Sequence, residues 1–161
     1  MKLTPLSELV GRLRTMQLGF MPTEGYDTLV AYILGFDVAT GGGALTGLRE
    51  WLITQVRDGT NLHWPTLVSM LMHQRAASNP EAREWGERER IDFLCDTLDE
   101  FFKVQQSRDG LSTIYFHYEA WLRRHKWYDP PTPYWLPPPA PKQPSRKRAK
   151  KAPTTRRKSG V

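Results

Sequence analysis

Four acidic residues of this chain recur at a spacing that would let them act together. Glu89, Asp92, Asp96 and Asp99 are separated by steps of three, four and three residues, which place side chains on one side of an α-helix. We call this set the acidic stripe. Three interpretations remain open: a solvated face, a docking surface for a basic partner protein, or a surface covered by the chain's own basic tail. A uniform row of carboxylates does not predict acid–base catalysis, which needs carboxylates in contrasting environments.

Basic residues gather near the C-terminus, where residues 141–161 contain nine of the 23 Lys and Arg and no acid. The two clusters of this basic tail (residues 142–161) comprise Arg146, Lys147, Arg148, Lys150, Lys151, Arg156, Arg157 and Lys158. A flexible arm of this charge attracts phosphate polymers, and salt weakens the attraction steeply. The tail therefore predicts non-specific nucleic-acid binding, with an accessory extension that has no selected partner as the alternative.

The stretch "TGGGALTGLREWL" (residues 40–52) raises the question of a phosphate-binding loop. Gly42 and Gly47 have the glycine spacing of such a loop, but Leu48 and Arg49 stand where Lys and Ser or Thr are required, and no strand precedes them. Free backbone amides at the start of a helix can still hold an anion. The sequence favours a tight turn between two helices and leaves anion binding at Gly41–Gly43 open.

The sequence gives little support for a metal site or for a nucleophilic cysteine. The spacing of the four histidines (His63, His73, His117 and His125) does not match that of zinc ligands, and no Glu-x-x-His occurs. The single cysteine, Cys95, falls on an apolar helix face and is expected to act as a small core residue. We predict no metal, no cofactor and no enzymatic activity.

The segment "IYFHYEAWLRRHKWYDPPTPYW" mixes aromatic and basic residues. Cations in a last helical turn favour the helix dipole, which is a structural reason for them. Aromatic and basic side chains together also stack on bases and hold phosphates. Because Tyr115, Tyr118 and Trp121 recur at helical spacing, the sequence favours the structural interpretation and predicts that they are core residues.

Six helices are predicted to position these groups, because six segments show helical periodicity and none shows strand alternation. The expected beginnings are at Pro5 after the capping Thr4, near Thr23, after the three glycines, at Pro65, at Asn79-Pro80 and after Gly110. The fifth helix is expected to run to about Lys103, with Gly86 as an interior weak point. We expect an all-α domain, a single helical bundle of about six helices over residues 1–128.

The character of the chain changes at Asp129. Eight of the 16 residues 129–144 are proline, which forbids helix and favours an extended conformation. Residues 129–141 are predicted to form a Pro-rich strap whose first part packs back on the bundle. Residues 142–161 have too little apolar surface to order themselves and are predicted to be disordered.

The net charge of +6 divides unevenly along the chain. Residues 1–140 carry 14 Lys and Arg against all 17 Asp and Glu, so a mildly acidic body bears a cationic tail. The apolar runs are too short to span a bilayer, and the N-terminus contains no secretory apolar region. A single cysteine permits no internal disulfide. We expect a cytoplasmic protein with no membrane contact and leave its oligomeric state open.

Three stretches occur in order across about residues 25–103: "YILGFDVATGGGALTGLREWLI", "GTNLHWPTLV" and "TLDEFF". Together they resemble small helical bacterial immunity-type proteins, which are encoded beside polymorphic toxins. The resemblance implies a non-catalytic inhibitor that masks a toxin domain and presents an acidic surface to it, a role that would suit the acidic stripe. The Pro-rich strap and the basic tail depart from that pattern, and no contact residues carry over.

The sequence therefore predicts a non-enzymatic protein-binding module, in the form of an immunity-type inhibitor that uses the acidic stripe. The alternative is a nucleic-acid-associated accessory protein that binds phosphates through its basic tail.

Overall fold

The computed structural model describes residues 4–78 and 85–130, and within these ranges the chain is entirely helical, with no strand. The predicted all-α class and the six helices are therefore confirmed. The elements are α1 (Leu6–Thr15), a 3-10 turn η1 (Gln17–Gly19), α2 (Tyr26–Ala39), α3 (Leu48–Val56), α4 (Trp64–Ala77), α5 (Glu87–Gln105) and α6 (Gly110–Leu122). The predicted basic tail and all but the first two residues of the predicted strap lie outside the described residues.

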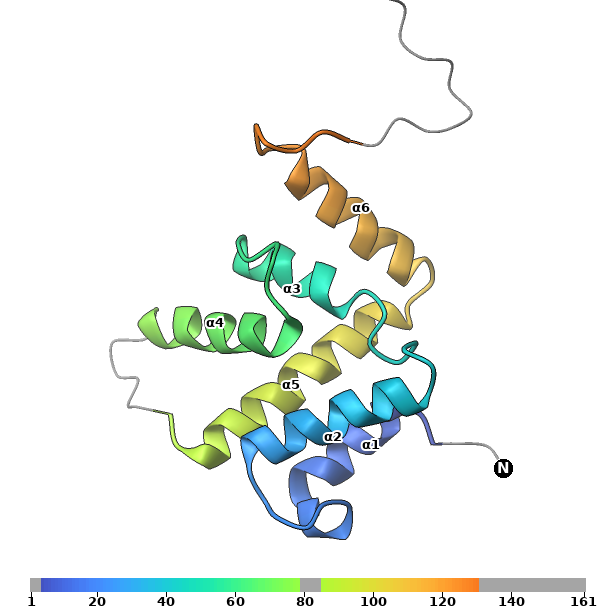
Figure 1. The fold of residues 1–161 in the computed structure, drawn as a ribbon, viewed down its shortest axis with the longest axis vertical. Coiled ribbons are helices and arrows are strands. Elements are labelled where there is room, and N and C mark those ends of the chain that lie inside the picture. The colour runs from blue at the N-terminus through green and yellow to red at the C-terminus, as the bar shows by residue number, and fades with distance from the viewer. Residues whose placement is uncertain (1–3, 79–84, 131–161) are drawn as a thin grey trace, which may run out of the picture. The chain divides into compact units, whose positions relative to one another are not determined.

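Helix α5 is the axis of the helical unit, which ends at Asp129 (Figure 1). It contacts α1, α2, α4 and α6, whereas α3 packs mainly on α4 and α6. The apolar residues that recur at helical spacing are buried as expected: Ile91, Leu94, Cys95, Leu98, Phe101 and Phe102. Phe93 and Thr97, which this pattern does not include, are buried as well. A helix that is covered by several neighbours needs a wide apolar face, which explains the additional buried positions.

The start of α2 differs from the sequence prediction by three residues. The helix begins at Tyr26 rather than near Thr23, because groups distant in sequence satisfy its first backbone amides. Glu87 of α5 accepts the Tyr26 N–H at 2.5 Å, and Gln17 of η1 accepts the Gly25 N–H at 2.9 Å. Contacts of this kind are invisible to local capping rules.

The prediction that Gly86 weakens the interior of the fifth helix is wrong. Gly86 is the residue before α5, with an extended backbone (φ −70°, ψ 172°), and the helix begins at Glu87. Glycine is accepted at such a flanking position because the residue there already leaves helical geometry. The expected cap at Asn79-Pro80 lies outside the described residues.

The prediction that Tyr115 is a core residue is also wrong, since 45% of Tyr115 is exposed. Trp121 is buried and Tyr118 is half-buried, so the expected face of α6 is shifted rather than absent. Helix α6 packs against α3 and α5, which cover only a narrow stripe of it. The helices in the described ranges include none that is long and apolar enough to cross a membrane.

Candidate functional site

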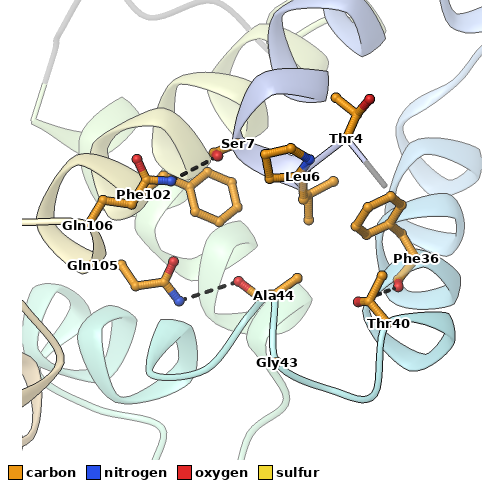
Figure 2. Close-up of a pocket in the computed structure, with 11 residues that line it drawn as sticks. Thr4, Leu6, Ser7, Phe36, Thr40, Gly43, Ala44, Phe102, Gln105 and Gln106 are labelled. Carbon is orange, nitrogen blue, oxygen red and sulfur yellow. Dashed lines mark hydrogen bonds between the residues drawn. The ribbon is translucent and has the colours of Figure 1, made fainter. Parts of the chain in front are cut away.

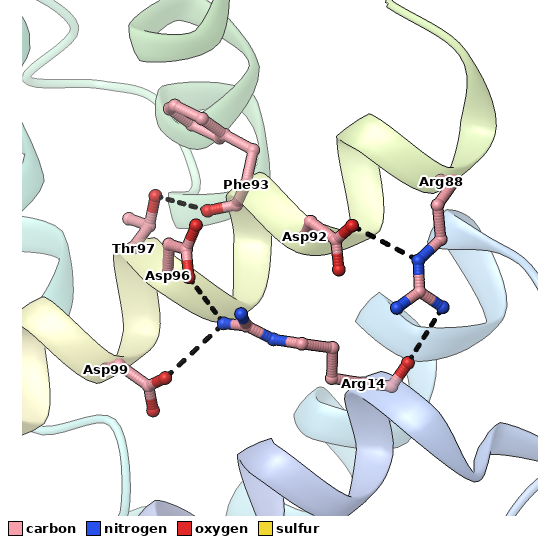
Figure 3. A network of polar contacts seen from close by, with 7 residues as sticks. All are labelled: Arg14, Arg88, Asp92, Phe93, Asp96, Thr97 and Asp99. Carbon is pink, nitrogen blue, oxygen red and sulfur yellow. Dashed lines mark hydrogen bonds and ion pairs between the residues drawn. The ribbon is translucent and has the colours of Figure 1, made fainter.

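The acidic stripe lies where α5 faces α1, and three of its four carboxylates bind arginines of the same chain (Figure 3). Arg14 of α1 donates from Nη2 to Asp96 at 2.5 Å and to Asp99 at 3.4 Å. Arg88 donates from Nε to Asp92 at 3.1 Å and from Nη1 to the carbonyl oxygen of Arg14, also at 3.1 Å. The stripe is thus part of a polar network that joins two helices.

This network reduces the charge that the stripe offers to a partner but does not bury it. The Asp96 side chain remains 59% exposed, and Glu89 is exposed without an ion pair to another described residue. Burial opposes the charge of Arg14, yet the hydrogen bond and the charge of Asp96 outweigh it and raise the pKa of the guanidinium. Arg14 therefore stays charged and continues to neutralise the stripe at any ordinary pH.

The lone cysteine lies directly behind this network. Cys95 is 1% exposed, and burial raises the pKa of its thiol to about 11, although the nearby Arg14 guanidinium acts in the opposite direction. A nucleophilic cysteine needs an accessible thiolate near neutral pH. The environment of Cys95 instead keeps the protonated thiol, as expected for a core residue.

The glycine-rich segment forms a turn in which several polar groups already have partners in the protein. Gly41 and Gly42 adopt left-handed backbone angles (φ 83° and 75°), which glycine tolerates best. The carboxylate of Asp37 accepts the Leu45 N–H at 3.0 Å, so a negative charge already lies at this turn and opposes the binding of an anion. Gln105 of α5 donates to the carbonyl oxygen of Thr46 at 2.9 Å and fixes the turn. This geometry favours the tight-turn interpretation.

A cleft of about 370 Å³ lies beside this turn (Figure 2). Leu6, Phe36 and Phe102 point into it, and no charged side chain lines it. Its amides are satisfied by the protein itself, since Gln106 donates to the Ser7 hydroxyl at 2.8 Å. The cleft therefore offers shape but no group to orient a reactive or charged ligand.

A second cleft, of about 580 Å³, lies between α3 and α6 and has a different chemistry. Trp51 of α3 and Trp121 of α6 line it, together with two arginines, Arg57 and Arg124, and no acid. Arg57 follows α3 directly and adopts a left-handed conformation (φ 61°), whereas Arg124 follows the end of α6. The other lining residues are Thr54, Gln55, Val104, Thr113, Ile114, His117 and Ala120.

Large aromatic side chains are exposed on α6 and just after it. Phe116 is 70% exposed and Trp127 is 60% exposed. The chain after α6 folds back on the helix, because the Tyr128 hydroxyl donates to Glu119 at 2.5 Å and the His125 ring lies 4.2 Å from that of Trp121. We call this region, comprising Tyr115, Phe116, Trp127 and the cleft between α3 and α6, the α6 surface.

Sequence reasoning placed Tyr115 in the core and did not single out Arg57. The available indication was the mixture of aromatic and basic residues in the final helix, which the helical spacing of the aromatics outweighed. No group of three or more His, Cys, Asp or Glu side chains among the described residues is arranged to hold a metal ion. The tail cations, from Arg146 to Lys158, lie outside the described residues.

Similarity to known proteins is the usual guide to function. Comparisons of the chain with protein-family models, with curated proteins and with solved structures find no match. A function must therefore be inferred from the α6 surface, the acidic stripe and the basic tail.

Proposed function

We propose that this chain is a non-enzymatic protein-binding module that docks through the α6 surface. One observation carries the proposal: Phe116 and Trp127 expose most of their area to solvent, beside a partly exposed Tyr115. Exposed aromatic side chains are costly in water, and aromatic side chains supply much of the binding energy at protein interfaces. The raised pKa of the buried Cys95 thiol supports the non-enzymatic part of the proposal.

The partner is a protein that presents an acidic segment with apolar side chains. Cations follow the last turns of α6, where Arg124 and Lys126 have no ion pair with another described residue. Charges of one sign around an apolar surface steer partners of the opposite sign and set specificity. A cytoplasmic location belongs to the same proposal and is supported by the chain's single cysteine.

The immunity-type interpretation is one form of this proposal, and it uses the acidic stripe instead. The exposed Asp96 and Glu89 side chains support it, whereas the ion pairs of Arg14 and Arg88 lower the charge available for it. Charge reversal at Asp92 and Asp96 would weaken a complex formed through the stripe. The same reversal would leave a complex formed through the α6 surface intact, provided that the variant is folded.

Selection from a phage-displayed library of random peptides tests the proposal. We expect the full chain to enrich peptides that combine acidic and aromatic residues, and Phe116→Ser to lose them because the exposed ring is gone. Val38→Ser is the matched control, since Val38 is also an exposed apolar residue but lies at the end of α2. Equal enrichment by Phe116→Ser and the unmodified chain would refute docking through the α6 surface.

Nucleic-acid association is the second candidate function, and the nine Lys and Arg of residues 141–161 favour it. In this version the helical unit is a scaffold and the tail supplies affinity for phosphates. Truncation after Ala140 leaves every described residue in place and should abolish retention of DNA or RNA in a low-salt gel shift. Retention by the truncated chain would exclude the tail as the binding element.

A further inference from the structure

We propose that the cleft between α3 and α6 binds a carboxylate and an adjacent apolar side chain of a partner's acidic segment. In this site Arg57 and Arg124 hold the carboxylate, and Trp51 and Trp121 hold the apolar side chain. The inference rests on the proposed protein-binding function and assigns the ligand class to one part of the α6 surface.

The two arginines of the cleft stand apart from the rest. Within the described residues, every other arginine has a carboxylate partner or, for Arg12, an aromatic ring beneath the guanidinium. Arg57 and Arg124 have neither, yet both line the same concavity. Arginine presents a planar fork of donors that matches a carboxylate, so two available guanidinium groups form a suitable receptor for one.

The conformation of Arg57 gives a second, independent reason. Its left-handed φ of 61° falls at the end of α3, a position where glycine is the favoured residue. A non-glycine residue in this region is uncommon, and such strain gathers at binding sites. Arginine at this position costs stability in the free protein relative to glycine, and a side chain that serves a ligand is one reason to keep it there. Asp109, before α6, has the same φ of 61°.

The aromatic walls of the cleft are held in place before any ligand arrives. Trp51 is buried against Phe101, with ring centroids 5.9 Å apart. Trp121 lies between Tyr118, whose ring is parallel within 11°, and His125. Rigid walls reduce the ordering cost of binding, and a volume of about 580 Å³ is within the usual range for ligand sites.

The same side chains could stack on a base and hold a phosphate, but a protein segment fits the charges better. Single-stranded nucleic acid needs a cationic groove that follows successive phosphates. Here the cations are few. Asp58 follows Arg57 in the chain, and Glu119 precedes Ala120, which lines the cleft. Repulsion from these carboxylates opposes a polyphosphate more strongly than it opposes a single carboxylate.

Fluorescence anisotropy on the full chain at near-physiological salt tests the inference with defined probes. The first probe is a labelled peptide of alternating Asp and Phe. Two matched peptides replace Phe by Ser or Asp by Lys, and the last probe is single-stranded oligothymidylate. We expect the Asp-Phe peptide to bind more tightly than all three other probes. The basic tail alone would hold the Asp-Ser peptide as well as the Asp-Phe peptide, because it has no apolar site.

Variants of the cleft locate the binding. Arg57→Gly removes the guanidinium and suits the left-handed backbone, so the fold is retained. Arg57→Gly and Arg124→Gln should each weaken binding of the Asp-Phe peptide about tenfold, as expected for loss of a charged hydrogen bond. Arg108→Gln removes the same charge at a side chain that is 98% exposed and should change affinity less than about twofold.

The outcomes separate this inference from the proposed function. If the Asp-Phe peptide binds and Phe116→Ser weakens it while Arg57→Gly and Arg124→Gln do not, the cleft assignment is overturned and the protein-binding function stands. If no peptide binds, both are overturned. If oligothymidylate binds through Arg57 and Arg124 in preference to the peptide, the cleft is a nucleic-acid site and the inference is overturned.

Discussion

At the scale of single residues, the environment of each side chain decides its chemistry more than its type does. Cys95 of α5 and Arg14 of α1 illustrate this, because they lie close together where α1 and α5 face each other. Burial keeps the thiol protonated, whereas the hydrogen bond to Asp96 keeps the guanidinium charged. A cysteine beside an arginine is therefore not an activated nucleophile here.

Cys95 should make the protein less stable at alkaline pH. The pKa of the thiol is about 11 in the folded protein against an ordinary 9.0, so the stabilisation is complete below pH 9 and is lost as the pH rises toward 11. We expect unfolding free energy to fall by at most about 1.4 kcal/mol per pH unit from this group. Urea titrations of the native chain and of Cys95→Ala measure it.

The Cys95→Ala variant should show a shallower alkaline decline. It will not be flat, because burial also raises the pKa of Tyr26 and adds a decline of the same sign. Identical pH profiles for the two proteins would mean that the folded environment of Cys95 does not hold its proton.

Two glycines in helices should respond in opposite ways to alanine. At Gly110 a Cβ would overlap the carbonyl oxygen of Val104 and lie 2.6 Å from that of Gln105, so the turn between α5 and α6 must shift. At Gly11 inside α1 a Cβ meets nothing within 4 Å. We expect Gly110→Ala to destabilise by about 2 kcal/mol or more and Gly11→Ala to stabilise by about 0.5–1 kcal/mol. Thermal unfolding of the pair checks both signs.

At the scale of elements, α5 has two roles that its sequence combines on opposite faces. One face fills the core, and the other carries the carboxylates that bind α1 through Arg14 and Arg88. It also contributes Glu87 to the first turn of α2. An acidic helix face is therefore a means of attaching neighbouring helices in this protein, in addition to any use by a partner.

Charge reversal within the acidic stripe should distinguish paired from unpaired carboxylates. Asp96→Lys places a second cation beside Arg14 and should cost about 1–2 kcal/mol of unfolding free energy, whereas the exposed Glu89→Lys should change it by no more than about 0.5 kcal/mol. Chemical denaturation provides the comparison. Equal effects would mean that the contact of Arg14 with Asp96 does not stabilise α1 on α5.

At the scale of the whole molecule, the described hydrophobic core and the excess positive charge come from different parts of the chain. The described residues of all six helices contribute to one core cluster, whereas the excess of positive charge comes from residues 141–161. The pI of about 9.6 thus describes the tail more than the helical unit.

Truncation after Ala140 should separate these two properties. We expect the melting temperature to change by less than about 2 °C, because every core residue that the structure describes is retained. The net charge should change sign, so the truncated chain binds an anion exchanger while the full chain binds a cation exchanger. A large loss of thermal stability would show that the removed residues contribute to the fold.

The sequence by itself determined the helical class, the number of helices and most of the core. Apolar residues at helical spacing identify which side of each helix avoids water, and this is local information. It was less reliable for α6, because Tyr115 continues the periodic pattern but remains 45% exposed. Periodicity identifies an apolar face without revealing how widely that face is covered.

Only the tertiary structure decided which partners the polar groups have. Arg14 and Asp96 are 82 residues apart in the chain, and nothing near either residue indicates the other. The same holds for Glu87, which accepts a hydrogen bond from the first residue of α2, and for Arg57 and Arg124, which line one cleft. The physical reason is that the apolar face of a helix is visible in the local periodicity of the sequence. A charged group, in contrast, pairs with whichever group the fold brings within a few ångströms.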